Sequence, residues 1–237
     1  MHPTLALMND LASRWDIAGD RRSVFLSCYA LMTENMLQAV DDGVFHDGIW
    51  VERLVRRFAE YYFAGVQAYE RDHAATPAAW RAAHDATKRT ETMTLQHLFL
   101  GINAHINYDL ALTLVDLLEK DWPTLPQPEK RRRYEDYCRV NDVIGETIDA
   151  VQKQVVERFT PSLVIVDTLF LHGDEWLLSR LVAHWREEVW VNAESLLALP
   201  ASGEKRANVV GLIEAMALER ADAILLRDGV KGLRKLL

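Results

Sequence analysis

One segment restricts the fold of this chain more than any other. Residues 95–118, LQHLFLGINAHINYDLALTLVDLL, are apolar on nearly every side when they are placed on a helix. A helix with this pattern is buried over most of its surface, so other elements of the same protein must surround it. The segment therefore predicts a helix inside a bundle.

The rest of the chain also has the sequence pattern of helices. Apolar residues recur every three or four positions, as in Leu181, Val182, Trp185 and Val189, and no long stretch alternates with the period of two that is typical of a strand. The 11 glycines and 7 prolines are fewer than average usage would give in 237 residues. We predict helices near residues 4–15, 21–42, 49–73, 77–89, 92–119, 129–158, 162–171, 174–199, 203–227 and 229–236.

Prolines mark the boundaries between these segments. Thr76-Pro77 and Thr160-Pro161 have the composition of helix starts, and Asp47-Gly48 offers another N-terminal cap. A proline-rich stretch near residues 120–128 predicts a stiff connector that is too short to separate independent domains. We therefore expect residues 1–237 to form one all-α domain, a bundle of about eight to ten helices.

Charge and missing motifs exclude several classes of function. The chain has 27 Lys and Arg against 35 Asp and Glu, so its net charge of −8 would repel the phosphates of a nucleic acid or an anionic membrane. It has no glycine-rich phosphate loop, no GxSxG nucleophile motif, no paired CxxC and no HExxH. No apolar run approaches the ~20 residues of a membrane span, and the first residues lack the basic region of a secretion signal. We expect a cytoplasmic protein without a nucleic-acid or membrane partner, and the sequence leaves open whether it is a monomer or a homo-oligomer.

Polar residues inside the apolar segment are the candidates for function. They are His97, Asn103, His105, Asn107, Asp109 and Asp116. A buried amide or carboxylate is costly without partners, so these groups need hydrogen bonds, a metal, a ligand or water. At the roughly 100° per residue of an α-helix, His105, Asp109 and Asp116 share one stripe, while Asn103 and Asn107 lie on nearly the opposite side. One face of the helix would then hold chemistry, and the other would attach it to its neighbours.

His105 and Asp109 have two interpretations. In the first, Asp109 orients a buried histidine within a hydrogen-bond network that joins helices. In the second, the His-x-x-x-Asp spacing supplies two ligands of a divalent metal, or a general base with its orienting carboxylate. Gly101 lies one turn earlier on the same stripe, where the missing side chain lets another helix or a ligand come close. A second pair at this spacing, His184 and Glu188, is interpreted as a solvated contact on a helix surface.

The resulting hypothesis is a small-molecule enzyme of unknown reaction. His105 and Asp109 would be a base and its partner, or metal ligands, and Asn103, Asn107 and Asn141 would orient the substrate or the backbone. If Asn141 faces the central segment, it would pair with Asn103 or Asn107. The alternative is a non-catalytic helical binding or scaffold protein, in which the same residues form a closed structural network.

The centre of the apolar segment also carries a resemblance. Residues 100–110, LGINAHINYDL, resemble the signature of a bacterial, all-helical family of uncharacterised function, which has the core G-[M/I]-N-A-H-I-N-x-D-L. Looser similarities, among them Arg186 and Trp190, extend it over roughly residues 22–195. The resemblance implies an all-α fold but no substrate or reaction. It also implies that the family's marked positions are Asn103, His105, Asn107 and Asp109.

Overall fold

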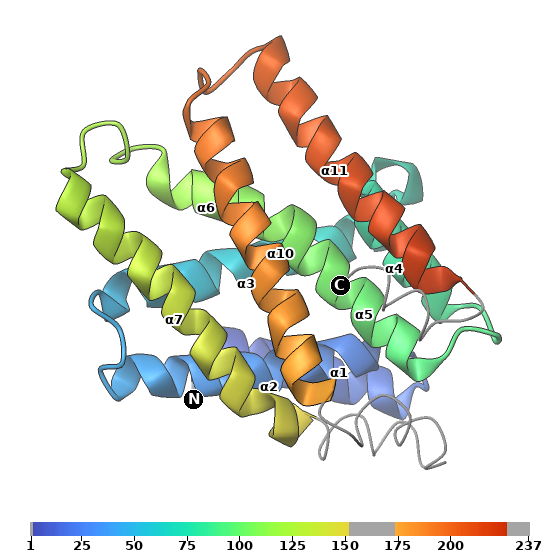
Figure 1. Ribbon diagram of the computed structural model, residues 1–237. Coiled ribbons are helices and arrows are strands. Elements are labelled where there is room, and N and C mark those ends of the chain that lie inside the picture. Colours follow the sequence, from blue (N-terminus) through green and yellow to red (C-terminus); the bar gives the residue numbers. More distant parts are fainter. Residues whose placement is uncertain (1, 152–173, 227–237) are drawn as a thin grey trace.

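The computed structural model describes residues 2–151 and 174–226, and all regular secondary structure in these ranges is helical (Figure 1). The all-α prediction is therefore confirmed. The elements are α1 (Pro3–Ile17), α2 (Arg22–Asp41), α3 (Gly48–Arg71), η1 (His73–Ala75), α4 (Ala78–Thr87), α5 (Thr94–Ala104), η2 (His105–Asp109), α6 (Leu110–Leu118), α7 (Gln127–Val151), α10 (Asp174–Leu197) and α11 (Glu204–Leu225). The helices predicted near 162–171 and 229–236, and the helix start at Thr160-Pro161, lie outside the described residues.

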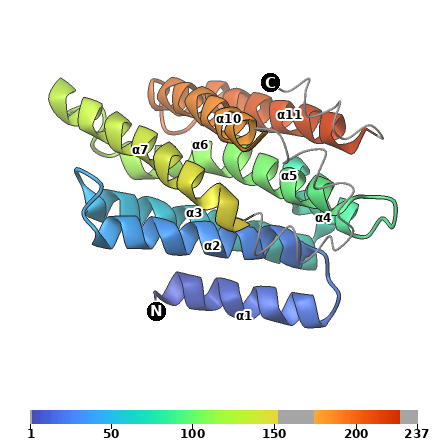
Figure 2. The same ribbon diagram turned by 60° about the horizontal axis from the view of Figure 1, so that its bottom comes forward.

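The helices form layers around one long helical rod. The rod, Thr94–Leu118, consists of α5, η2 and α6 without a break. α2 and α3 pack on one side of the rod and α10 and α11 on the opposite side, while α1 lies outside α2 (Figure 2). α4 contacts α5 and α11, and α7 contacts α2 and α10. The apolar segment is thus the central element of the bundle.

The rod is long and apolar enough to cross a membrane by length and composition alone. Within its most apolar stretch, however, 78% is buried inside the structure. A core helix meets the same criteria, and here the neighbouring helices cover its apolar surface.

Two clusters of buried side chains meet along the rod. Leu98 and Phe99 of α5 belong to the first cluster, and Leu110 and Leu114 of α6 belong to the second. Each such side chain contributes about 1.5–3 kcal/mol when it is fully buried, so the rod stabilises both halves of the bundle. The short element η2 lies where the two clusters join.

The start of α4 differs in detail from the sequence expectation. The helix begins at Ala78, and Pro77 occupies the capping position in place of the first helical one. The Thr76 hydroxyl donates a hydrogen bond to the Asp72 carbonyl (3.2 Å) and does not cap α4. The free Ala78 N–H is instead bound by the Glu214 carboxylate of α11 (2.5 Å). A partner from a distant helix has replaced the local cap, which sequence alone does not reveal.

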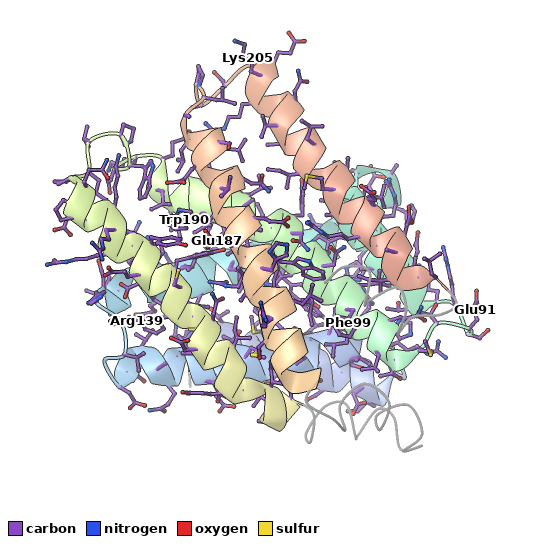
Figure 3. All side chains as sticks on the ribbon, viewed as in Figure 1. Glu91, Phe99, Arg139, Glu187, Trp190 and Lys205 are labelled. Atoms are coloured by element: carbon purple, nitrogen blue, oxygen red, sulfur yellow. The ribbon has the colours of Figure 1, made fainter. Side chains whose placement is uncertain are left out.

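The connector between α6 and α7 spans residues 119–126, close to the proline-rich stretch expected to separate them. Its Trp122 packs edge-on against Trp190 of α10, with ring centroids 5.7 Å apart. Trp190, which Figure 3 labels, also packs against Tyr134 and Tyr137 of α7, with ring centroids 5.2 and 4.9 Å apart. These aromatic contacts hold α7 and α10 together beside the rod.

Candidate functional site

The middle of the rod departs from α-helical geometry. His105–Asp109 form a π-helical turn between α5 and α6. Such a turn adds one residue to an α-helix, so everything after it is rotated by roughly 100° from the register that an unbroken α-helix would have. π-Turns are rare and occur frequently at functional sites.

This rotation overturns the expected position of Asp116. The carboxylate does not share the stripe of His105 but reaches the protein surface, where it accepts hydrogen bonds from Arg57 (2.6 Å) and Tyr61 (2.8 Å). The prediction was wrong because it assumed an unbroken α-helix between residues 105 and 116.

His105 and Asp109 do lie together, and a third side chain joins them. His105 Nδ1 lies 3.0 Å from Asp109 Oδ2, and the Trp80 indole N–H donates to the same oxygen at 2.9 Å. All three side chains are buried, and at most 3% of any of the three residues is exposed. Asp109 therefore connects the rod to α4 and fixes the position of the histidine ring.

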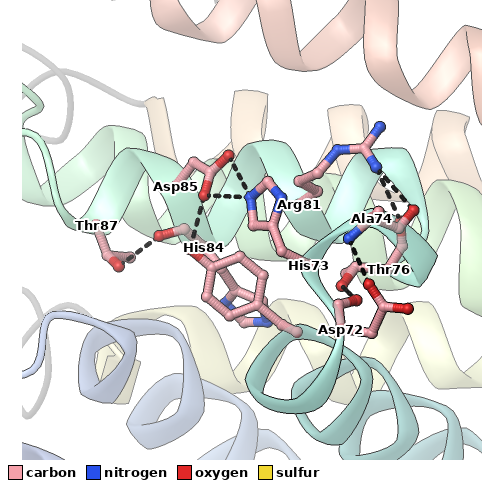
Figure 4. A network of polar contacts seen from close by, with 9 residues as sticks. Asp72, His73, Ala74, Thr76, Arg81, His84, Asp85 and Thr87 are labelled. Carbon is pink, nitrogen blue, oxygen red and sulfur yellow. Dashed lines mark hydrogen bonds and ion pairs between the residues drawn. The ribbon is translucent and has the colours of Figure 1, made fainter.

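Trp80 is itself held firmly. A side chain at Gly65 would come within 3.0 Å of the indole, so α4 approaches α3 closely only because Gly65 has none. Asp85, also on α4, accepts a hydrogen bond from the Tyr69 hydroxyl of α3 (2.6 Å). It also contacts His73 Nε2 (2.9 Å), as Figure 4 shows. Trp80 thus presents its N–H to Asp109 from a fixed helix.

Aromatic rings surround His105. Its ring stacks on Phe58 with centroids 3.4 Å apart and an angle of 5° between the planes. Tyr29 meets it edge-on at 4.4 Å. The second ring nitrogen, Nε2, is buried and has no hydrogen-bond partner among the residues that the structure describes.

Burial determines the charge state of the pair. It lowers the pKa of His105 well below its usual value and raises the pKa of Asp109 well above its usual value, although the Trp80 N–H partly opposes the second shift. Both shifts favour uncharged groups, so at neutral pH the imidazole is neutral.

A cavity of about 130 Å³ lies beside His105. Its walls are mostly apolar and come from α2, α3, α7, α10 and the rod. Tyr29 and Thr33 line it together with His105. Cys28, an unpaired cysteine, also lines it, and burial raises the pKa of its thiol to about 12, so the thiol is protonated at neutral pH. We call this space the His105 cavity.

Arg186 of α10 forms part of the opposite wall. Its Nε donates to the Asn141 side-chain oxygen (2.6 Å), its Nη2 donates to the Tyr137 carbonyl (2.9 Å), and its guanidinium lies over the Tyr137 ring. Asn141 therefore pairs with Arg186 and not with Asn103 or Asn107. The sequence did hold a signal for Arg186, because it interrupts the apolar stripe of α10 between Val182 and Val189.

Asn103 and Asn107 have a different environment from His105. Asn107 Nδ2 donates to Asn103 Oδ1 (2.9 Å), and Asn103 Nδ2 donates to the Ala217 carbonyl of α11 (2.7 Å). About two turns nearer the start of the rod, Gln96 donates to the Ile224 carbonyl (2.8 Å). These amides attach α11 to the rod, and none of them lines the His105 cavity.

A metal site is not assembled by the described residues. They contain no group of three or more His, Cys, Asp or Glu side chains placed to hold an ion, whereas zinc sites in proteins have three or four protein ligands. The His184 and Glu188 pair is 3.7 Å apart with the histidine side chain 62% exposed, which fits the surface contact expected for it.

The chain belongs to a family of unknown function, DUF5995, whose family model matches residues 1–227. Comparisons with curated proteins and with solved structures give no match. Family membership supplies no reaction or ligand, so the function has to be argued from the site.

Proposed function

We propose that this protein is an enzyme acting on a small, mostly apolar molecule that binds in the His105 cavity. The observation that carries the proposal concerns a buried histidine whose Nδ1 is fixed by Asp109: its Nε2 has no hydrogen-bond partner in the described part of the chain. An unpaired buried polar atom costs about 1–3 kcal/mol, and a ligand in the adjacent cavity would supply the missing partner. The NAHINxDL core would then be the signature of the family.

The geometry supports a role for His105 in proton transfer. When Nδ1 donates to Asp109, Nε2 carries a lone pair that accepts a hydrogen bond or a proton from the ligand. Asp109 orients the ring and faces the imidazolium that forms, and Trp80 in turn orients Asp109. The stacked Phe58 ring excludes water and strengthens these interactions.

The size of the cavity limits the ligand. An engineered apolar cavity of about 150 Å³ in another protein binds benzene, so the His105 cavity, at about 130 Å³, suits a molecule of roughly six to ten non-hydrogen atoms. A nucleotide or a polymer does not fit this space.

The rival proposal, a non-catalytic binding or scaffold protein with a structural network, has specific support. The bonds of Asn103, Asn107 and Gln96 fix α11 on the rod and need no ligand. A structural role does not account for His105, because within residues 2–151 and 174–226 it leaves Nε2 unpaired in a residue that lines a cavity. If His105 and Asp109 instead hold a divalent metal, the ion needs a further ligand from outside the described residues.

Binding is tested first with phenol and benzene on protein labelled with ¹⁵N in its histidines. Phenol can donate a hydrogen bond to Nε2, whereas benzene only fills space. We expect His105 to carry its proton on Nδ1 and phenol to shift the Nε2 resonance strongly, with a smaller effect of benzene. An Nε2 resonance that saturating phenol leaves unchanged would refute the site.

Turnover is tested by incubating a small-molecule extract with the wild-type protein, His105→Gln and Asp109→Asn, after circular dichroism has shown that the variants fold. The matched control is Asp116→Asn, which changes an exposed carboxylate of the same rod. We expect the wild-type protein and the control to consume a compound that the two site variants leave intact. Equal consumption by His105→Gln, or none by the wild-type protein, would contradict catalysis by His105.

A further inference from the structure

We propose that Arg186 makes the His105 cavity specific for a small organic acid, whose carboxylate pairs with the guanidinium while its apolar body lies beside His105. This inference rests on the proposed function, because it names the class of ligand for the same cavity. Arg186 is 3% exposed and lines the cavity together with His105.

Arg186 has no counter-charge among the described residues, although a buried arginine needs one. In the part of the chain that the structure describes, its side-chain partners are the neutral Asn141 oxygen, the Tyr137 carbonyl and the Tyr137 ring, and no carboxylate is paired with it. Burial lowers the pKa of Arg186, yet a guanidinium keeps its proton in proteins. A buried charge without an opposite charge is strongly unfavourable, so an anion is the expected partner.

The rest of the cavity wall determines which kind of anion fits. Among the described residues that line it, Arg186 carries the only formal charge, and the other polar groups are the neutral Cys28, Tyr29, Thr33 and His105. A phosphate or sulfate would need several charged or N–H donors, which these walls do not offer. A carboxylate needs one guanidinium fork, and the remaining apolar space accepts the hydrocarbon part of the same molecule.

The arginine is also positioned in advance. Asn141 and the Tyr137 carbonyl bind Nε and Nη2, and the guanidinium lies 4.2 Å from the centre of the Tyr137 ring. The Tyr137 hydroxyl in turn donates to the Arg186 carbonyl at 2.6 Å, so α7 and α10 fix the residue from both sides. The N–H groups that these bonds leave over are the donors that a carboxylate in the cavity would bind.

The test compares benzoate with benzyl alcohol, a neutral molecule of similar shape, by isothermal titration calorimetry. We expect the wild-type protein to bind benzoate about tenfold or more tightly than benzyl alcohol, because a charge-assisted pair forms with Arg186. Arg186→Met should remove this preference and leave the affinity for benzyl alcohol nearly unchanged. The matched control, Arg131→Met, changes an arginine whose side chain is 80% exposed on α7 and should leave both affinities unchanged.

The outcomes separate this inference from the proposed function. If phenol binds but the protein binds benzoate no more tightly than benzyl alcohol, the proposal of an organic-acid ligand is refuted, while the cavity remains a ligand site. If phenol, benzene, benzoate and benzyl alcohol all fail to bind, both the ligand site beside His105 and its specificity for an organic acid are refuted. If Arg186→Met does not fold, the wild-type preference decides together with Arg186→Lys, which keeps the charge but loses the fork and should bind benzoate more weakly than the wild-type protein.

Discussion

Replacing Asp109 by alanine should lower the free energy of unfolding by about 2–6 kcal/mol. The substitution removes the one oxygen that binds both the Trp80 N–H and His105 Nδ1, at 2.9 and 3.0 Å. Each buried donor left unpaired costs about 1–3 kcal/mol, which gives the range for two. The small void adds to this cost, while the loss of an unfavourably buried carboxyl group reduces it. Because a domain is typically stable by about 5–15 kcal/mol, such a loss is large.

Urea unfolding, followed by circular dichroism, measures this change. The control is Asp116→Ala, which removes an aspartate from the same rod whose carboxylate is 37% exposed and pairs with Arg57 at the surface. Exposed pairs contribute about 0–1 kcal/mol, so the control should cost less than 1 kcal/mol. If Asp109→Ala costs no more than Asp116→Ala, the buried hydrogen bonds do not hold α4 to the rod, and the positioning of His105 loses its basis.

Three further predictions test other parts of the structure. Gly101→Ala places a methyl group 2.3 Å from the Phe25 ring and should lower the free energy of unfolding, measured in a thermal melt, by about 1–3 kcal/mol or more. The control Gly211→Ala, which has open space around it, should not be destabilising. Burial lowers the pKa values of His84 and His97 to about 3 and about 4, so below pH 6.5 the unfolded state binds more protons than the folded state. Urea unfolding at pH 7 and at pH 5 should therefore show that the free energy of unfolding falls by about 2 kcal/mol per histidine at the lower pH. Equal urea midpoints at the two pH values would contradict this. Asn103→Ala should cost about 1–3 kcal/mol in urea unfolding, because it breaks two buried hydrogen bonds, yet leave phenol binding unchanged in a calorimetric titration.

The helices were predictable because their signals are local. The sequence predicted a helix near 49–73 after Asp47-Gly48, and α3 spans Gly48–Arg71 with the Asp47 carboxylate accepting a hydrogen bond from the Trp50 N–H (2.9 Å). It placed the central helix near 92–119, and the rod spans Thr94–Leu118. Caps, prolines and apolar periodicity all act within a few residues of the helix end that they define.

The contact between His105 and Asp109 was predictable for the same reason, since four residues along a helix bring two side chains together. Trp80 and Arg186 were not predictable as partners, because they reach the site from other helices and only the tertiary packing brings them there. Asp116 was misplaced because an inserted π-helical residue leaves no mark in the apolar pattern, although it rotates the rest of the helix by roughly 100°.

The unpaired polar atoms distinguish the structural part of the rod from its functional part. If its polar residues served only to fix the packing of helices, their hydrogen bonds would all be satisfied, as the bonds of Asn103 and Asn107 to each other and to α11 illustrate. His105 departs from this, because its Nε2 has no partner among the described residues while the residue lines a cavity. Nε2 of His84 also has no hydrogen-bond partner among the described residues, but the space that His84 and His97 both line measures about 10 Å³, which is room for one water. His97 also lines a wider hollow of about 500 Å³, whose walls include the charged residues Asp20, Arg21 and Glu91. The His105 cavity differs from the wider hollow beside His97 in its mostly apolar walls, and from the small space beside His84 in its room for an organic molecule. Arg186 adds a buried charge to its wall.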